Sequence, residues 1–241
     1  MKSKRIVYLL VFMFLFACIT VSCKKGNGML VTEEINIEDY DAINITGSAV
    51  VNYEQVGGPP YLKFTIDENI LKNVNIYVKK GTLHVSLKNK GNVGVSYTSY
   101  IVNTNSRNLS DINSSGSGKI NLLSDVKTDD LNIELSGSGS VNSEKSVIVN
   151  TLKSSISGSG KVSLKGESET CILEITGSGR ITSSGFSTAH LKCHISGSGK
   201  VEMHVTESIE CNISGSGNLT YSGEPSSVNH SVNGSGKLVK R

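Results

Sequence analysis

The chain is poor in the residues that build helices and large aromatic cores. Its 241 residues include no Trp, only 3 Pro and only 5 Phe. Ala, the strongest helix former, occurs at four positions (Ala17, Ala42, Ala49 and Ala189), which is too few for a helical protein. Charged residues make up 19% and apolar residues 37% of the chain, which excludes a disordered acidic tail and a polytopic membrane protein. The composition favours an all-β body.

The N-terminus has the pattern of a lipoprotein export signal. A basic start precedes an apolar run over 6–21, and this order is typical of a signal peptide. Cys23 follows directly after Val21-Ser22, which resembles a bacterial lipobox and implies lipid on the sulfur and amine of that cysteine. We therefore expect a signal peptide over 1–22, membrane attachment through Cys23, and a flexible tether over 23–34. An uncleaved anchor is the alternative.

Removal of this leader abolishes the positive charge of the chain. The formal charge is +3, with 24 basic and 21 acidic residues. Lys2, Lys4 and Arg5 lie in the leader, so the mature part has 21 residues of each sign. Such a chain gives no electrostatic basis for binding nucleic acid.

Gly-Ser-Gly triplets recur at a period close to 20 residues. Successive first glycines are separated by 21, 21, 19, 20, 18 and 19 residues. The triplets begin at Gly116, Gly137, Gly158, Gly177, Gly197, Gly215 and Gly234. Repeats of this length indicate a solenoid, because a single unit cannot bury its apolar face and a stack of units can.

Apolar and polar residues alternate in a fixed phase around each triplet. Apolar side chains mostly lie two and four residues before its first glycine and four residues after it, as Ile213, Cys211 and Leu219 do. Hydroxyl, amide or basic residues lie one residue before it and one and three residues after it. This alternation predicts half-buried strands. The glycines have the inward phase, which lets the wall bend or two backbones approach closely. We predict a parallel β-solenoid with coils about 4.8 Å apart and a turn at each triplet.

The first part of the mature chain is less regular. Alternating stretches within 61–87 predict strands, and Gly57-Gly58-Pro59-Pro60 predicts a turn. We interpret 35–107 as irregular first coils of the solenoid and 108–241 as its regular part. A separate small β domain is the alternative for the first part.

A family resemblance is carried by 40–47 (Tyr-Asp-Ala-Ile-Asn-Ile-Thr-Gly) and by the serial Ser-Gly-Ser-Gly copies that follow. Over 35–240 the chain resembles the auto-transporter adhesin head GIN domain family. The resemblance implies a right-handed parallel β-helix of the pectin-lyase type, with Gly-Ser-Gly turns between sheets. It also implies a role in adhesion, no assigned catalytic residue, and homo-oligomers as a candidate assembly.

A carbohydrate-active enzyme, a polysaccharide lyase or hydrolase, is the alternative function, since a β-helix wall can carry clustered carboxylates. Glu174 and His194 are predicted neighbours on adjacent coils. Glu134 and Glu174 would lie about 9.6 Å apart, at the upper edge for an inverting pair. A Glu–His pair on a solvated wall is ordinarily a weak surface pair. We assign no catalytic residue and no cofactor. The five histidines (His84, His190, His194, His204 and His230) lack metal-ligand spacing.

Basic residues recur three positions after the first glycine of a triplet. We call this set the basic column, and it comprises Lys119, Lys161, Arg180, Lys200 and Lys237. The column is the candidate surface for an anionic glycan or a headgroup, and the alternative role is solubility and protection of sheet edges. Tyr97 and Tyr100 are further candidates for stacking on sugar rings, against ordinary packing.

Three cysteines, Cys171, Cys193 and Cys211, have the inward phase. Cys193 and Cys211 fall in one column, at a spacing that permits a disulfide. Because buried Cys often behaves as a small apolar residue, we expect unpaired interior thiols.

These features together predict a non-enzymatic, lipid-anchored β-solenoid of the cell envelope, at the outer membrane, that presents a repetitive face for adhesion or scaffolding. A purely structural envelope protein is a further alternative.

Overall fold

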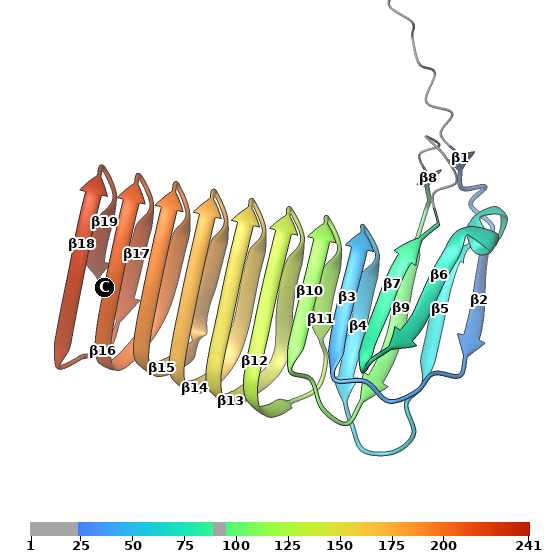
Figure 1. Ribbon diagram of the computed structural model, residues 1–241, viewed down its shortest axis with the longest axis horizontal. Helices are drawn as coiled ribbons and strands as arrows, with labels where there is room; N and C mark the ends of the chain where they lie inside the picture. The colour runs from blue at the N-terminus through green and yellow to red at the C-terminus, as the bar shows by residue number, and fades with distance from the viewer. Residues whose placement is uncertain (1–23, 89–94) are drawn as a thin grey trace, which may run out of the picture.

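The computed structural model describes residues 24–88 and 95–241. The predicted leader and Cys23 lie outside the described residues. The described residues are 73% strand and 3% helix and form a β-solenoid whose stacked coils are about 20 residues apart. It extends from a group of antiparallel strands at one end to the C-terminal coil at the other (Figure 1). The all-β solenoid expected from the repeat is therefore confirmed.

Each regular coil rises on one face, turns at its Gly-Ser-Gly triplet, and descends on the other (Figure 1). We call the residues before a triplet the front face and those after it the back face. The strands of the coils are β3 (Ala42–Gly47), β4 (Val50–Gln55), β10 (Asp111–Gly116), β11 (Lys119–Leu122), β12 (Val126–Gly137), β13 (Ser140–Gly158), β14 (Lys161–Gly177), β15 (Arg180–Gly197), β16 (Lys200–Gly215), β17 (Asn218–Ser222), β18 (Ser227–Gly234) and β19 (Lys237–Lys240).

Neighbouring coils pair in parallel with equivalent residues in register. Between β12 and β13, for example, Glu134 lies opposite Ser155 and Gly137 opposite Gly158. Each position of the repeat therefore becomes a column that runs along the solenoid axis. The inward columns form one continuous apolar core that includes Ile175, Ile195 and Ile213.

Both glycines of a triplet are required by the geometry of the corner. The backbone of Gly177 has φ +114°, and a Cβ there would lie 2.7 Å from the carbonyl oxygen of Gly158 in the preceding coil. The second glycine, Gly179, packs on the core, since its Cβ would lie 2.6 Å from Cγ2 of Ile156. A side chain would therefore strain the backbone at the first position and clash at the second.

The N-terminal end of the solenoid is closed by strands that change direction. β7 (Thr82–Leu87) and β9 (Tyr100–Ser106) add one parallel layer by pairing with β3 and β4. Beyond them the pairing is antiparallel. The N-terminal cap, as we name it, comprises β2 (Leu30–Ile35), β5 (Leu62–Asp67), the 3₁₀ helix η1 (Glu68–Asn73) and β6 (Val74–Lys79). The short strands β1 (Lys24–Lys25) and β8 (Val95–Ser96) pair in parallel beside it.

This arrangement corrects two expectations. The stretch 35–107 is not a series of irregular coils throughout, because 62–79 runs antiparallel to the parallel stack. The stretch 30–35 is strand β2 rather than part of a flexible tether. Lys80 (φ 51°) and Gly81 (φ 74°) form the two-residue loop of the β6–β7 hairpin, which reverses the chain. The stretch 30–35 is a strand because its backbone pairs with the antiparallel strand β5.

A buried carboxylate fastens the cap to the start of the described chain. Asp67, at the end of β5, is fully buried. Its oxygens accept N–H groups from Gly28 and Thr98, each at 2.7 Å. Burial by itself raises the pKa of the Asp67 carboxyl, but these donors outweigh it and hold the pKa below its ordinary value. The charged Asp67 side chain therefore holds the segments 26–29 and 97–99 together through these hydrogen bonds.

Candidate ligand-binding surfaces

The basic column lies on the back face, directly after the corners. All five of its side chains are exposed. None of the five forms an ion pair with a carboxylate of the described residues within 4.0 Å; the pairs found there involve other side chains. The column is interrupted by Ser140 and Asn218, which take the same position in two coils.

Lys161, Arg180 and Lys200 form an uninterrupted run in the middle of the column. They lie in register on three successive coils, about 4.8 Å apart by the spacing of paired strands. Like charges directly opposite one another destabilise a sheet. Their strands are paired on both sides, so protection of a sheet edge does not account for these three cations. Only Lys237 lies on the last coil.

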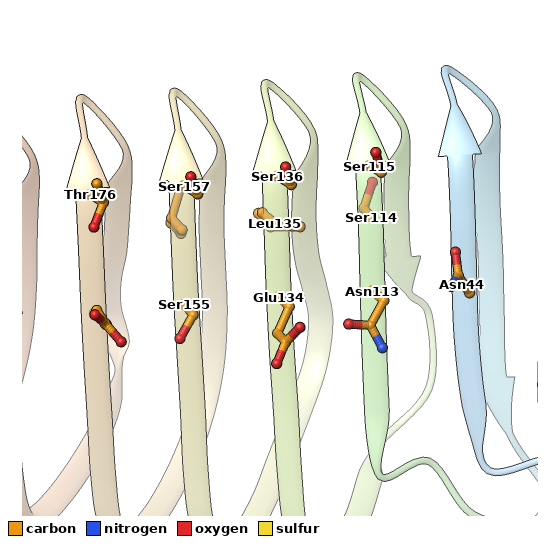
Figure 2. A pocket seen from close by; sticks show the side chains of 12 residues that line it. Asn44, Asn113, Ser114, Ser115, Glu134, Leu135, Ser136, Ser155, Ser157 and Thr176 are labelled. Atoms are coloured by element: carbon orange, nitrogen blue, oxygen red, sulfur yellow. The ribbon is translucent and has the colours of Figure 1, made fainter.

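The front face carries a groove of about 380 Å³ across five coils (Figure 2). Two outward rows of polar side chains line it. The lower row is Asn44, Asn113, Glu134 and Ser155, and the row nearer the corners is Ser115, Ser136, Ser157 and Thr176. The register of β13 and β14 adds Glu174 to the lower row. Neither row contains a cation or an aromatic ring. Two further hollows, of about 590 and 300 Å³, adjoin this groove, because Glu174 lines all three.

The polar groups of the front groove are largely free of partners within the described chain. Glu134 accepts one hydrogen bond, from Nδ2 of Asn132 at 3.3 Å. The back face differs, because its asparagines bond to one another: Asn121 donates to Asn52, and Asn52 to Asn103, each at 2.9 Å. These back-face amides bond to one another, whereas the polar side chains of the front groove are available to bond to solvent or to a ligand.

The residues considered for catalysis lie on neighbouring coils but do not contact one another. Glu174 and His194 lie opposite each other in register on β14 and β15 and both line the hollow of about 300 Å³. They do not approach within 4.0 Å, and His190 is the histidine that has carboxylates near it, Glu169 at 3.7 Å and Glu207 at 3.5 Å. Glu134 and Glu174 are two coils apart with Ser155 between them. Within the described residues, the hydrogen bond from Asn132 to Glu134 is the one side-chain hydrogen bond of either glutamate, and neither has a base or acid partner within hydrogen-bond reach.

The remaining candidates are buried, except for Tyr97, which is partly buried. Tyr100 is buried, with its ring edge-on to Tyr97 at 5.7 Å and its hydroxyl donating to the Ser86 carbonyl at 3.3 Å. The Tyr100 side chain therefore packs in the core and is not available to stack on a sugar ring. The three inward cysteines are buried free thiols, as predicted, and burial raises the pKa of the Cys171 thiol.

Two other properties follow from the described residues. Within 24–88 and 95–241, no three His, Cys, Asp or Glu side chains are placed to hold a metal ion. No helix in the same part of the chain is long and apolar enough to cross a membrane.

The front groove was not among the sites predicted from the sequence. Its rows were visible there as polar columns one and three residues before each triplet. The depth of the groove was not visible in the sequence, because it depends on the relative lengths of side chains that lie side by side on neighbouring coils. The change from Asn113 through Glu134 and Ser155 to Glu174 along one row was the available signal.

Comparison with solved structures finds the same solenoid in several bacterial proteins. A crystal structure of a protein described as a "putative adhesin" from Bacteroides fragilis NCTC 9343 has a TM-score of 0.84 and 24% identity, covering 90% of this chain and 99% of that chain. At that identity, the likeness concerns the fold alone. No curated protein matches the chain.

Two further structures are more similar in sequence. One, described as a "putative adhesin" from Parabacteroides merdae ATCC 43184, is 32% identical with a TM-score of 0.69, covering 91% of this chain and 99% of that chain. The other, described as a "putative lipid binding protein" from Parabacteroides distasonis ATCC 8503, is 31% identical with a TM-score of 0.75, covering 90% and 98%.

The stacked coils and the polar columns on both faces define a parallel β-solenoid. The family model described as "Putative auto-transporter adhesin, head GIN domain" matches residues 39–225. The chain belongs to this family.

Proposed function

We propose that the protein is a non-enzymatic adhesin, held at the cell envelope by lipid on Cys23, and that its basic column binds an anionic glycan. Membership of an adhesin family supports the adhesive role. The observation that carries the ligand class is the unpaired run of Lys161, Arg180 and Lys200 in the interior of the sheet. A polyanion laid along the axis would relieve the repulsion among these cations.

A glycan fits this column better than a compact anion does. The cations recur at a fixed interval along a straight line and are flanked by exposed Ser159, Ser178 and Ser198 from the corners. A linear chain of acidic sugars offers carboxylates or sulfates at regular intervals together with hydroxyls for these serines. Long charged side chains of this kind also give binding that weakens with salt.

The test measures binding of full-length protein in detergent to oligogalacturonate and to heparin. We expect K161Q/R180Q/K200Q to weaken binding by about tenfold or more, which corresponds to about 1.4 kcal/mol, and to flatten its salt dependence. The matched control K79Q/K127Q/K145Q removes the same charge from exposed positions outside the column and should retain binding.

Two results would contradict the proposed ligand. One is equal binding by both triple variants. The other is binding to phosphatidylglycerol vesicles with none to either glycan, which would assign the column to a lipid surface. The anchor is tested separately, by incorporation of labelled palmitate into the wild-type protein and its loss in Cys23→Ala.

A further inference from the structure

The front groove has a chemistry opposite to that of the basic column. Its walls contain two carboxylates, Glu134 and Glu174, and no cation. These carboxylates disfavour an anionic ligand within the groove, although Lys153 and Lys192 line the adjoining hollows, so the groove itself offers a polymer the opposite charge to the basic column. The two surfaces also lie on opposite faces of the coils, before and after the corners.

We infer that this groove is a second binding site, which takes a neutral, polyhydroxylated glycan lying along the solenoid axis. The inference goes beyond the proposed function and does not depend on it. Carboxylate oxygens accept hydrogen bonds only, and such charge-assisted bonds are stronger than neutral ones. Sugar hydroxyls are suitable donors for Glu134 and Glu174. The hydroxyls of Ser136, Ser157 and Thr176 can donate to or accept from the same chain.

The spacing of the groove residues fits a linear polymer. Glu134, Ser155 and Glu174 stand on three successive coils in one row, about 4.8 Å from one coil to the next, which is the scale of a single pyranose ring. A carboxylate, a hydroxyl and a carboxylate thus face successive sugar units. The row extends to Asn113 and Asn44, whose amides offer both donors and acceptors.

An apolar contact lies beside the carboxylates. Ile172 is 36% exposed, although it is a large aliphatic residue. It lines both hollows that adjoin the groove at Glu174. The C–H face of a sugar ring held by Glu174 could cover this side chain and remove its apolar surface from water. A polyamine would satisfy the carboxylates, but its protonated amines only donate hydrogen bonds, whereas sugar hydroxyls both donate to and accept from the hydroxyl row, so a neutral glycan fits the whole site better.

The experiment titrates full-length protein in detergent with neutral hexasaccharides (cellohexaose, xylohexaose, mannohexaose and maltohexaose). We expect binding of at least one of them. E134Q/E174Q keeps the side-chain shape but removes the charged acceptors, and it should weaken that binding by about tenfold. The control E144Q/E202Q changes two carboxylates outside the groove and should bind as the wild type does. Ile172→Ser should also weaken binding, by a smaller factor.

Three results would overturn the inference. The first is that no neutral hexasaccharide binds. The second is that E134Q/E174Q and E144Q/E202Q bind equally well. The third is that spermine at equimolar concentration displaces the hexasaccharide. Circular dichroism of each variant establishes that it is folded. The column variant K161Q/R180Q/K200Q should still bind the neutral sugar, so failure of the groove and failure of the basic column are distinguishable.

Discussion

At the scale of single residues, the corner glycines are the strictest requirement of the fold. Gly177 has a backbone conformation that is essentially restricted to glycine, and the preceding coil occupies the space of a Cβ. Gly57, by contrast, has open space around its Cα and no positive φ. Gly177 and Gly57 thus differ in whether their positions can accept a side chain.

We therefore expect Gly177→Ala to lower the free energy of unfolding by about 3 kcal/mol or more. Gly57→Ala should change it by less than about 0.5 kcal/mol. Denaturant unfolding monitored by circular dichroism measures both. Similar unfolding midpoints for the two variants would show that the corner can relax to accept a side chain.

Two buried serines provide a second test at this scale. Oγ of Ser154 is buried without a hydrogen-bond partner, and Ser154 lies between Ile133 and Leu173 of the neighbouring coils. Oγ of Ser168 is also buried but donates to Thr188 at 3.0 Å. Because an unsatisfied buried hydroxyl costs free energy and a satisfied one does not, Ser154→Ala should stabilise the protein by about 1 kcal/mol. Ser168→Ala should destabilise it by about 1 kcal/mol. Shifts of the same sign would contradict this account.

At the scale of elements, the cap depends on one ionised side chain. Asp67 must be charged to accept the N–H groups of Gly28 and Thr98 at full strength. Since its pKa is lower in the folded protein than the ordinary 3.8, its contribution to stability is present above that value. The contribution is lost as the pH falls through the lowered pKa of the folded state.

We expect Asp67→Asn to be less stable than the wild type at neutral pH, with the difference shrinking below the ordinary carboxyl pKa of 3.8. Glu68→Gln removes a neighbouring exposed carboxylate and should leave stability and its pH dependence nearly unchanged. Urea unfolding of all three proteins at several pH values measures the effect. A difference between wild type and Asp67→Asn that is constant with pH would exclude the charge as its cause.

The elements also show what could be read from the sequence and what could not. In a parallel solenoid each residue stacks on its equivalent, so the period and phase of the triplets predicted the register of β12–β16 directly. The antiparallel cap was not predicted, because β5 and β6 alternate in the same way whichever direction they run. The basic column was visible as a repeated position. The front groove was not, since its shape depends on the relative reach of Glu134, Ser155 and Glu174.

At the scale of the whole molecule, the two ends of the solenoid differ. The N-terminal end is closed by the cap, whereas in the described chain β18 pairs only with β16, and β19 only with β17. The outer edges of β18 and β19 therefore have unpaired backbone groups. Val228, Val232 and Leu238 are only partly buried there. Such an edge is a template for pairing with a second copy.

Basic side chains lie at this edge. Lys237, Lys240 and Arg241 are exposed on the last coil. Lys240 pairs with Glu224 at 2.6 Å, whereas Lys237 and Arg241 form no ion pair with the described residues, so two such ends brought together would repel each other. We expect K237T/K240T/R241T to associate end to end, because it removes the charge and adds a residue that favours strands. The weight-average mass in sedimentation experiments should rise with concentration toward twice that of the wild type.

The control for this prediction tests whether association depends on where the positive charge is removed or only on how much is removed. K161T/R180T/K200T loses the same three charges, but from strands paired on both sides. It should keep the sedimentation behaviour of the wild type while losing affinity for anionic glycans. If both variants associated equally, the general loss of charge would be the cause. If only the C-terminal variant associated, the cations of the last coil would protect the edge, whereas Lys161, Arg180 and Lys200 within the stack would serve ligand binding alone.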